Sequence, residues 1–198
     1  MKRFFLVSAL VLGLMSTLAA QTRPNPYDGV PPAPAFSVTS SDVSTGAPFP
    51  AAQMSGAFGV PGGKDVSPQL SWTNVPAGTK SFVVTMYDPD APTPSGFWHW
   101  VVADLPATTT SLPAGAGSTD GKGLPAGAWQ LPNDARMAQY VGAAPPAGTG
   151  KHRYYIVVQA LDVATLPVPK DATPAFLSFN LLGHILGRAV LVPYAEVK

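Results

Sequence analysis

The sequence predicts a mainly β domain of antiparallel strands, with one helix near the C-terminus. Five runs are rich in β-branched and aromatic residues, and each is bounded by Pro, Gly, Asn or Asp. Helical segments between these runs are too few for a doubly wound α/β fold. The expected strands occupy residues 35–39, 69–72, 81–87, 99–103 and 153–161.

The first twenty residues have the pattern of a secretory signal peptide. Two basic residues precede an apolar run from Phe4 to Met15, and small residues follow through Ala20. A run of about 12 apolar residues is shorter than the roughly 20 that a membrane-spanning helix needs. We therefore expect removal of this segment (residues 1–20), export to the periplasm or the exterior, and no membrane span in the processed chain.

The charge and cysteine content narrow the classes of partner. The 198-residue chain has 12 Lys and Arg residues, 11 Asp and Glu residues and no Cys. Loss of the signal peptide leaves 10 basic residues against 11 acidic ones. A nearly neutral chain with scattered charge lacks the clustered basic face that nucleic acid binding needs. The sequence therefore indicates no nucleic acid partner, no disulfide and no thiol nucleophile.

A Pro-rich lead-in and one domain follow the signal peptide. Residues 21–34 are polar and rich in Pro, so we expect them to be extended without a core of their own. Residues 35–198 contain all the expected strands, and the 46% hydrophobic composition of the chain is enough for one core. Within this domain, residues 108–128 are rich in Gly, Ala, Ser and Thr and predict a long surface loop.

The helix near the C-terminus is predicted from about Pro174 to Arg188. Thr173 is a suitable N-cap, and Pro suits the first helical position. His184 falls inside this segment and is expected to be structural. The tail at residues 190–194 offers a last strand. Six apolar residues recur at helical spacing and are expected on one side: Phe176, Phe179, Leu182, Ile185, Leu186 and Ala189.

The first candidate site is the segment from Asp88 to Pro92, with Trp98-His99-Trp100 after it. Its prolines cannot donate ladder hydrogen bonds, so a strand ends here and an Asp can turn inward. Strand alternation places His99 on one face and both Trp side chains on the other. If Asp88 lies beside His99, the carboxylate fixes the imidazole tautomer or stabilises its protonated form. A plain Asp-Pro turn is the alternative interpretation.

The second candidate site is a Gly- and Pro-rich loop that leads into His152. Alternation places His152 and Tyr154 on one face. A second His and a phenol, under the rigid Pro145-Pro146 pair, would form a small pocket for an anionic or hydrogen-bond-accepting group. A structural imidazole is the alternative for each His alone.

Together these motifs resemble the two signature regions of the phosphatidylethanolamine-binding proteins. More narrowly, they are similar to the bacterial branch of that family, the Raf kinase inhibitor-like proteins. The matching motifs occur in the family's order over roughly residues 36–194. The resemblance implies an antiparallel β-sandwich with a few short helices. It also implies a cis peptide bond before Pro89.

The resemblance further implies a small cavity that binds phosphate-type groups, including phospholipid headgroups. In the family, acidic, imidazole and phenol side chains line this cavity, and small or proline residues form its walls. Carried over by motif position, the ligand-binding residues are Asp88, Ala91, Pro92, His99, Pro145, Pro146, His152 and Tyr154.

We therefore predict an exported, non-catalytic protein that holds a small anionic ligand without a cofactor or metal. Binding should strengthen as the pH falls, because each imidazole gains a proton and a donor. One alternative is an inhibitor of a protease or another enzyme, acting through loops at the pocket mouth such as residues 113–125. Another is a metal-dependent enzyme that uses two His and one Asp as ligands.

Overall fold

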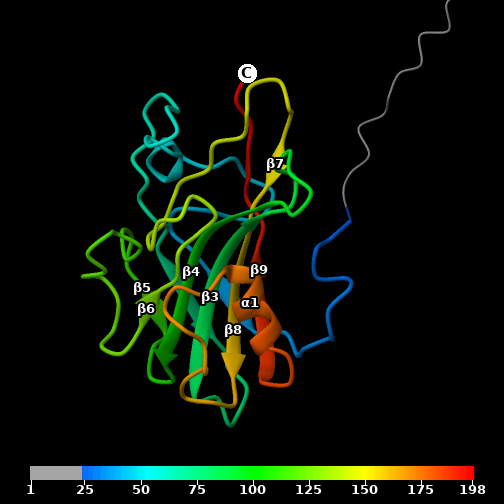
Figure 1. The fold of residues 1–198 in the computed structure, drawn as a ribbon, viewed down its shortest axis with the longest axis vertical. Helices are drawn as coiled ribbons and strands as arrows, with labels where there is room; N and C mark the ends of the chain where they lie inside the picture. Colours follow the sequence, from blue (N-terminus) through cyan, green and yellow to red (C-terminus); the bar gives the residue numbers. More distant parts are fainter. Residues whose placement is uncertain (1–23) are drawn as a thin grey trace, which may run out of the picture.

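The computed structural model describes residues 24–198, which fold into three antiparallel sheets and one α-helix. The largest sheet runs through the middle of the molecule (Figure 1) and has the strand order β6-β4-β3-β8-β9. Its strands are β3 (Ser81–Asp88), β4 (Phe97–Pro106), β6 (Trp129–Gln130), β8 (Tyr155–Leu161) and β9 (Ile185–Leu191).

Two smaller sheets and one 3₁₀ turn complete the regular structure. A three-stranded sheet has the order β1-β2-β5, and β10 pairs with β7 in a two-stranded sheet. These elements are β1 (Ser37–Thr39), η1 (Ala51–Gln53), β2 (Leu70–Thr73), β5 (Ser111–Leu112), β7 (His152–Arg153) and β10 (Tyr194–Ala195).

The three-stranded sheet packs on one face of the five-stranded sheet. Leu70 and Trp72 of β2 point inward and are fully buried. They belong to the same apolar cluster as Val84 and Met86 of β3 and Trp100 of β4. Because side chains alternate along a strand, every second residue of β3 enters this cluster. The predicted antiparallel β-sandwich is confirmed.

The helix α1 (Pro174–Asn180) covers the opposite face of the five-stranded sheet. The Oγ1 atom of Thr173 accepts the backbone N–H of Phe176 at 3.2 Å, which is the expected N-cap. Leu177 and Leu181, one turn apart, pack against side chains of β3 and β4 in a second apolar cluster. The predicted start of the helix is confirmed.

The prediction that this helix extends to Arg188 is wrong. Gly183 has a φ of +87°, a left-handed conformation that favours glycine and terminates helices. The chain then reverses into β9, which pairs with β8, so the apolar residues after 184 follow a strand period. Phe176 and Phe179 are 47% and 72% exposed, because the helix turns its other side to the sheet.

Three smaller expectations are also changed. His184 lies in the turn before β9 rather than in a helix, and its Nδ1 is 2.8 Å from a carboxylate oxygen of Asp162. The segment 108–128 is not all surface, because it contains β5 and the fully buried Ala116. Every peptide bond among residues 24–198 is trans, including the one before Pro89.

The N-terminal part of the described chain lies against the sandwich. Figure 1 shows it, in blue, running alongside β9, and Ala35 forms a bridge with Arg188. The Tyr27 ring lies over the Arg188 guanidinium at 4.9 Å. No helix in residues 24–198 is long and apolar enough to cross a membrane. The predicted signal peptide, residues 1–20, is outside the described part of the chain.

An irregularity in β4 determines how the first motif is presented. Met86 pairs with Trp100 and Tyr87 pairs with Trp98, so His99 is the extra residue of a β-bulge. The bulge turns the two Trp side chains to opposite faces. Trp100 enters the sandwich core, whereas Trp98 stacks on Tyr87 at 4.5 Å beside the cluster under α1. The expectation that both Trp side chains share a face is therefore wrong.

Candidate ligand-binding cavity

A small cavity of about 180 Å³ opens where the loop after β3 meets the loop before β7. Pro89 ends the ladder of β3 and the bulge re-aims the start of β4, so both motifs reach this end of the sheet. Five of the predicted site residues line the cavity: Asp88, Ala91, Pro92, His99 and Pro146.

The other three predicted residues lie behind or beside this cavity. His152 and Tyr154 are 1% and 0% exposed. The Tyr154 ring meets the His99 ring edge-on at 5.2 Å, so it supports a residue that does line the cavity. Pro145 is buried next to Pro146 and does not contribute to the lining.

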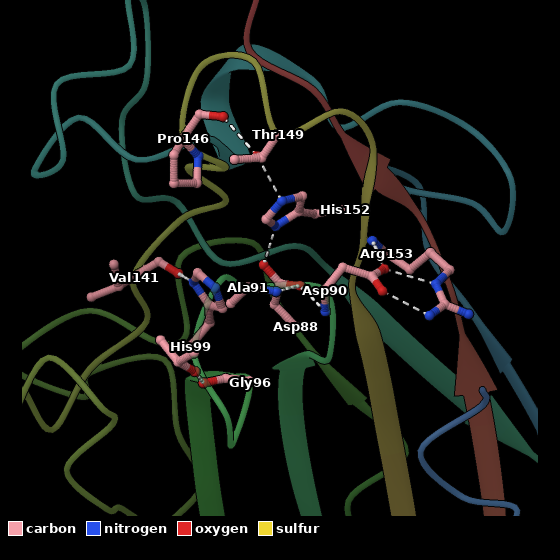
Figure 2. A network of polar contacts seen from close by, with 11 residues as sticks. Asp88, Asp90, Ala91, Gly96, His99, Val141, Pro146, Thr149, His152 and Arg153 are labelled. Atoms are coloured by element: carbon pink, nitrogen blue, oxygen red, sulfur yellow. Dashed lines mark hydrogen bonds and ion pairs between the residues drawn. The ribbon is translucent and has the colours of Figure 1, made fainter. Parts of the chain in front are cut away.

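Asp88 is the centre of the polar network in Figure 2. Its Oδ1 accepts the backbone N–H groups of Asp90 at 2.8 Å and Ala91 at 2.9 Å, which holds the loop after β3 in a turn. Its Oδ2 is 2.8 Å from Nδ1 of His152, and both side chains are buried. The carboxylate therefore orients His152, and the expected pair between Asp88 and His99 is wrong.

His152 is engaged at both ring nitrogens. Its Nε2 is 2.8 Å from Oγ1 of Thr149, and that hydroxyl is 2.7 Å from the carbonyl oxygen of Pro146. A carbonyl oxygen only accepts, so Thr149 donates to Pro146 and accepts from the His152 Nε2–H. With Nδ1 bonded to the carboxylate, His152 has no donor left for a ligand.

His99 is bonded to the protein at one nitrogen only. Its Nδ1 donates to the carbonyl oxygen of Val141 at 3.0 Å, and Val141 in turn donates its N–H to the His99 carbonyl at 3.1 Å. Burial lowers the pKa of His99 to about 4, against the opposing effect of the Asp88 charge. The ring is therefore neutral at pH 7. Its Nε2 has no hydrogen-bond partner of good geometry among residues 24–198, although the backbone of Gly142 lies close to the ring, and it offers a lone pair to the cavity.

Tyr154 does not present its hydroxyl to the cavity as expected. The hydroxyl oxygen is sealed from solvent and has no hydrogen-bond partner of good geometry in the described structure. Burial raises the pKa of Tyr154 above its usual value, and the nearby charge of Asp88 adds to this. The phenol is a packing residue here, wedged between the rings of His99 and Phe49.

An ion pair fixes the far side of the Asp88–Pro92 loop. Arg153 donates from Nε to Oδ2 of Asp90 at 2.8 Å and from Nη2 to Oδ1 at 2.8 Å. The backbone N–H of Arg153 also reaches Oδ2 at 2.9 Å. This bidentate contact ties the loop to β7 and directs the guanidinium toward the carboxylate of Asp90.

Four lining residues were missed by the sequence motifs. The Phe58 ring, 49% exposed, stands edge-on to Phe97 at 6.3 Å. Its loop is brought to the cavity because Asp65 accepts the backbone N–H of Gly142 at 2.8 Å. That contact joins segments remote in sequence, so no local signal marks it. The missed residues are Phe58, Thr93, Phe97 and Ala144.

The segment expected at the cavity mouth, residues 113–125, does not line it. The backbone N–H of Gly115 donates to the Ser67 carbonyl at 2.9 Å, and the N–H of Gly117 donates to Ser67 Oγ at 2.9 Å. These bonds fasten the segment near β2 and β5. The loops that do border the cavity carry Phe58, Pro92 and Pro146.

The described residues also bear on the metal-site alternative. Among residues 24–198, no group of three or more His, Cys, Asp or Glu side chains is arranged to hold a metal ion. Asp88 and His152 are bonded to each other, and Nδ1 of His99 is used by Val141.

Comparison with known proteins identifies the family. The family model for phosphatidylethanolamine-binding protein matches residues 39–195, which include every residue that lines the cavity. The chain belongs to the phosphatidylethanolamine-binding protein family. The resemblance seen in the motifs is confirmed.

The bacterial branch of the phosphatidylethanolamine-binding proteins is represented among the relatives. YbcL of Escherichia coli is 45% identical over 166 residues, covering 84% of this chain and 90% of YbcL. The crystal structure of YbcL matches with a TM-score of 0.79 at 44% identity, covering 82% of this chain and 99% of that structure. YbhB of Escherichia coli is 51% identical over 127 residues, covering 64% of this chain and 79% of YbhB.

 LppC of Mycobacterium tuberculosis, a candidate lipoprotein, is 36% identical over 169 residues, covering 83% of this chain and 76% of LppC.

Proposed function

We propose that this chain is an exported, non-catalytic protein that binds a phosphate-type anion, such as a phospholipid headgroup, in the cavity at His99. The observation that carries the proposal is the open Nε2 of a buried imidazole whose other nitrogen is held by Val141. The family to which the chain belongs is named for a phospholipid and supports this choice of ligand.

A neutral imidazole binds an anion only together with a proton. The lone pair on His99 Nε2 repels a fully ionised oxygen and attracts an O–H group. A phosphate monoester has its second pKa near about 6, so its monoanion carries such a hydroxyl. An anion beside His99 also raises the pKa of the imidazole. Both effects make binding stronger as the pH falls.

The remaining cavity groups are compatible with an anion. Asp88 is bonded to His152 and to two backbone N–H groups, so its carboxylate oxygens are engaged by the protein. The cavity walls are mostly apolar, from Ala91, Pro92 and Phe97. A volume of about 180 Å³ has room for a phosphate with a short substituent.

The proposal includes export and a single binding domain. The signal-peptide pattern at residues 1–20 and the similarity to LppC support export to the periplasm or the exterior. Residues 35–198 would form the binding domain, because the residues that line the cavity all lie between positions 58 and 146 of that segment.

Isothermal titration with phosphate and with phosphoethanolamine tests the proposal. Measurements at pH 5.5 and 7.5, each in two buffers of different ionisation enthalpy, report both the affinity and the protons taken up. We expect the affinity for phosphoethanolamine to be roughly 25-fold higher at pH 5.5, because a group with a pKa of about 6 is far more protonated there, and we expect uptake of close to one proton per bound monoester at pH 7.5.

The matched variants are His99→Ala and His184→Ala. His99→Ala removes the open nitrogen and should abolish binding. His184→Ala removes an imidazole that lies in the turn before β9 and should leave binding unchanged. The proposal would be contradicted if the wild-type protein bound neither ligand at either pH value, or if the two variants bound the ligands equally well.

A further inference from the structure

A second cavity, of about 210 Å³, lies between the five-stranded sheet and α1, and it shares no lining residue with the first. Strands β3, β4, β8 and β9 form its floor, the helix forms one wall, and residues 26–30 close it from the other side. The lining residues used below are Tyr27, Trp98, Gln159, Ser178, Leu182 and Arg188.

Arg188 is the unusual group in this cavity. Its side chain is half-buried, and among residues 24–198 it has no acidic partner and no side-chain hydrogen bond. Its Nε is sealed from solvent without a partner, and the contact that it does make is with the Tyr27 ring at 4.9 Å. Buried charges in proteins are normally paired, because desolvation of an unpaired charge is costly.

Electrostatics supports the same interpretation. Burial lowers the pKa of Arg188, and Tyr27 is the residue near enough to oppose this. No carboxylate acts to raise the pKa of Arg188. The guanidinium nevertheless stays charged, because arginine does not lose its proton in folded proteins. The cavity therefore contains a positive charge that its own walls do not neutralise.

A neutral donor stands beside this charge. Gln159 on β8 is paired directly with Arg188 on β9, so both side chains project from the same face of the sheet. Gln159 is 5% exposed and lines the cavity. A guanidinium and an amide side by side offer several N–H donors to one acceptor group.

The rest of the cavity is mostly apolar. Trp98, stacked on Tyr87, forms one wall, and Leu181 with Leu182 forms another. Leu182 is 47% exposed and stands at the mouth. The volume corresponds to about seven water molecules, since a water occupies about 30 Å³ in the liquid. This is the size of a small organic acid.

We propose that this second cavity binds a small carboxylic acid with an apolar body. The carboxylate pairs with the guanidinium of Arg188 and accepts from the amide of Gln159. A planar carboxylate matches the fork of an arginine, which makes it the best-fitting anion. The apolar body lies against Trp98 and extends toward Leu182 at the cavity mouth. This site is independent of the phosphate-type ligand proposed for the first cavity.

Isothermal titration at pH 7 with phenylacetate, octanoate and phenylacetamide tests this site. We expect at least one of the two acids to bind, and phenylacetamide to bind at least tenfold more weakly because it lacks the charge. Tighter binding of phenylacetate would mean that the whole apolar part of the acid lies inside the cavity. Tighter binding of octanoate would mean that the apolar part extends past Leu182. Saturating phosphate should not displace either acid.

Three variants locate the binding. Arg188→Gln should lower the affinity for the acid by roughly tenfold to a hundredfold, as expected for loss of a charge-assisted hydrogen bond. Arg136→Gln removes the same charge from an exposed loop position and should have no effect. Ser178→Phe fills the cavity from α1, keeps Arg188 and should block the acid, so it tests the site even if Arg188→Gln folds poorly.

Two results would overturn the inference. One is that neither acid binds the wild-type protein more tightly than phenylacetamide does. The other is that the Ser178→Phe variant binds the acid as tightly as the Arg136→Gln variant does. Thermal unfolding followed by circular dichroism confirms that each variant is folded before it is titrated.

Discussion

The two cavities differ in how their buried charges are satisfied. In the first, Asp88 is bonded to His152 and Asp90 to Arg153, so the open atom is the neutral nitrogen of His99. In the second, the guanidinium of Arg188 has no acidic partner among the described residues. Paired charges hold a loop in place, whereas an unpaired charge is available to a ligand. Substitution of the paired charges beside the first cavity should therefore lower stability, whereas substitution of Arg188 in the second should affect ligand binding and change stability little.

The largest effect is expected for Asp88→Ala. The substitution leaves His152 without its carboxylate and frees two backbone N–H groups of the loop, so the free energy of unfolding should fall by about 3 to 5 kcal/mol. Urea denaturation measures this change.

Asp162→Ala is the control for that experiment. Asp162 also meets a His side chain at 2.8 Å, but the two side chains of that pair are 45% and 39% exposed. Its loss should lower the free energy of unfolding by less than about 1 kcal/mol. Equal losses of unfolding free energy in the two variants would show that burial does not increase the contribution of the Asp88–His152 pair to stability.

The next effect is a dependence of stability on pH that comes from His99. Burial lowers the pKa of His99 to about 4 in the folded protein, whereas an unfolded chain has a His pKa near about 6.5. The unfolded chain therefore takes up a proton that the folded protein does not, and stability falls as the pH drops from about 6.5 to 4. The expected total is roughly 2 to 3 kcal/mol.

His99→Phe removes this titration while keeping an apolar ring in the bulge. Urea denaturation of both proteins at pH 7, 5.5 and 4.5, without phosphate, gives the difference in the free energy of unfolding. The variant should lose less stability than the wild type over this range. Parallel curves would mean that His99 is not held neutral by burial.

A smaller effect separates the two arginines. Arg153→Gln removes a bidentate partner of Asp90 and should lower the free energy of unfolding by about 1.5 to 3 kcal/mol. Arg188→Gln loses only the contact with the Tyr27 ring and should change stability by less than about 1 kcal/mol. Urea denaturation at pH 7 compares them, and a larger loss for Arg188→Gln would refute the comparison.

The Arg153 contribution also has a defined pH range. Burial acts to raise the pKa of Asp90, but the hydrogen bonds and charge of Arg153 hold it below its usual value. The pair therefore stabilises the protein above about pH 4, the usual range of an unfolded Asp, and the contribution is lost as the pH falls through the lowered pKa. The difference between wild type and Arg153→Gln should shrink in acid.

The smallest effect is expected for Thr149→Val. This substitution removes the hydroxyl that joins His152 to the Pro146 carbonyl and should cost about 0.5 to 1.5 kcal/mol. Thr119→Val, at an exposed hydroxyl bonded to Gln139, should cost less. Thermal unfolding of the two variants at pH 7 checks the order, and a greater loss for Thr119→Val would contradict it.

The sequence predicted β3, β4 and β8 of the large sheet because their β-branched and aromatic runs are local signals, whereas the two-residue β6 gave no such signal. It failed at β9, where the apolar residues after Gly183 fit a helical period as well as a strand. At the site, the motifs located five lining residues but assigned Asp88 to the wrong imidazole. The bulge at His99 and the pairing of β7 with β10 decide which ring reaches the carboxylate.

By itself the sequence determined the features that depend on a few neighbouring residues. These are the main strand runs, the Asp-Pro end of β3, the cap at Thr173 and the motifs that resemble the family. Only the tertiary structure decided that Asp88 pairs with His152, that His99 is neutral, and that Arg188 is unpaired. The physical reason is distance along the chain: Asp88 and His152 are 64 positions apart, and burial is a property of the whole packed domain.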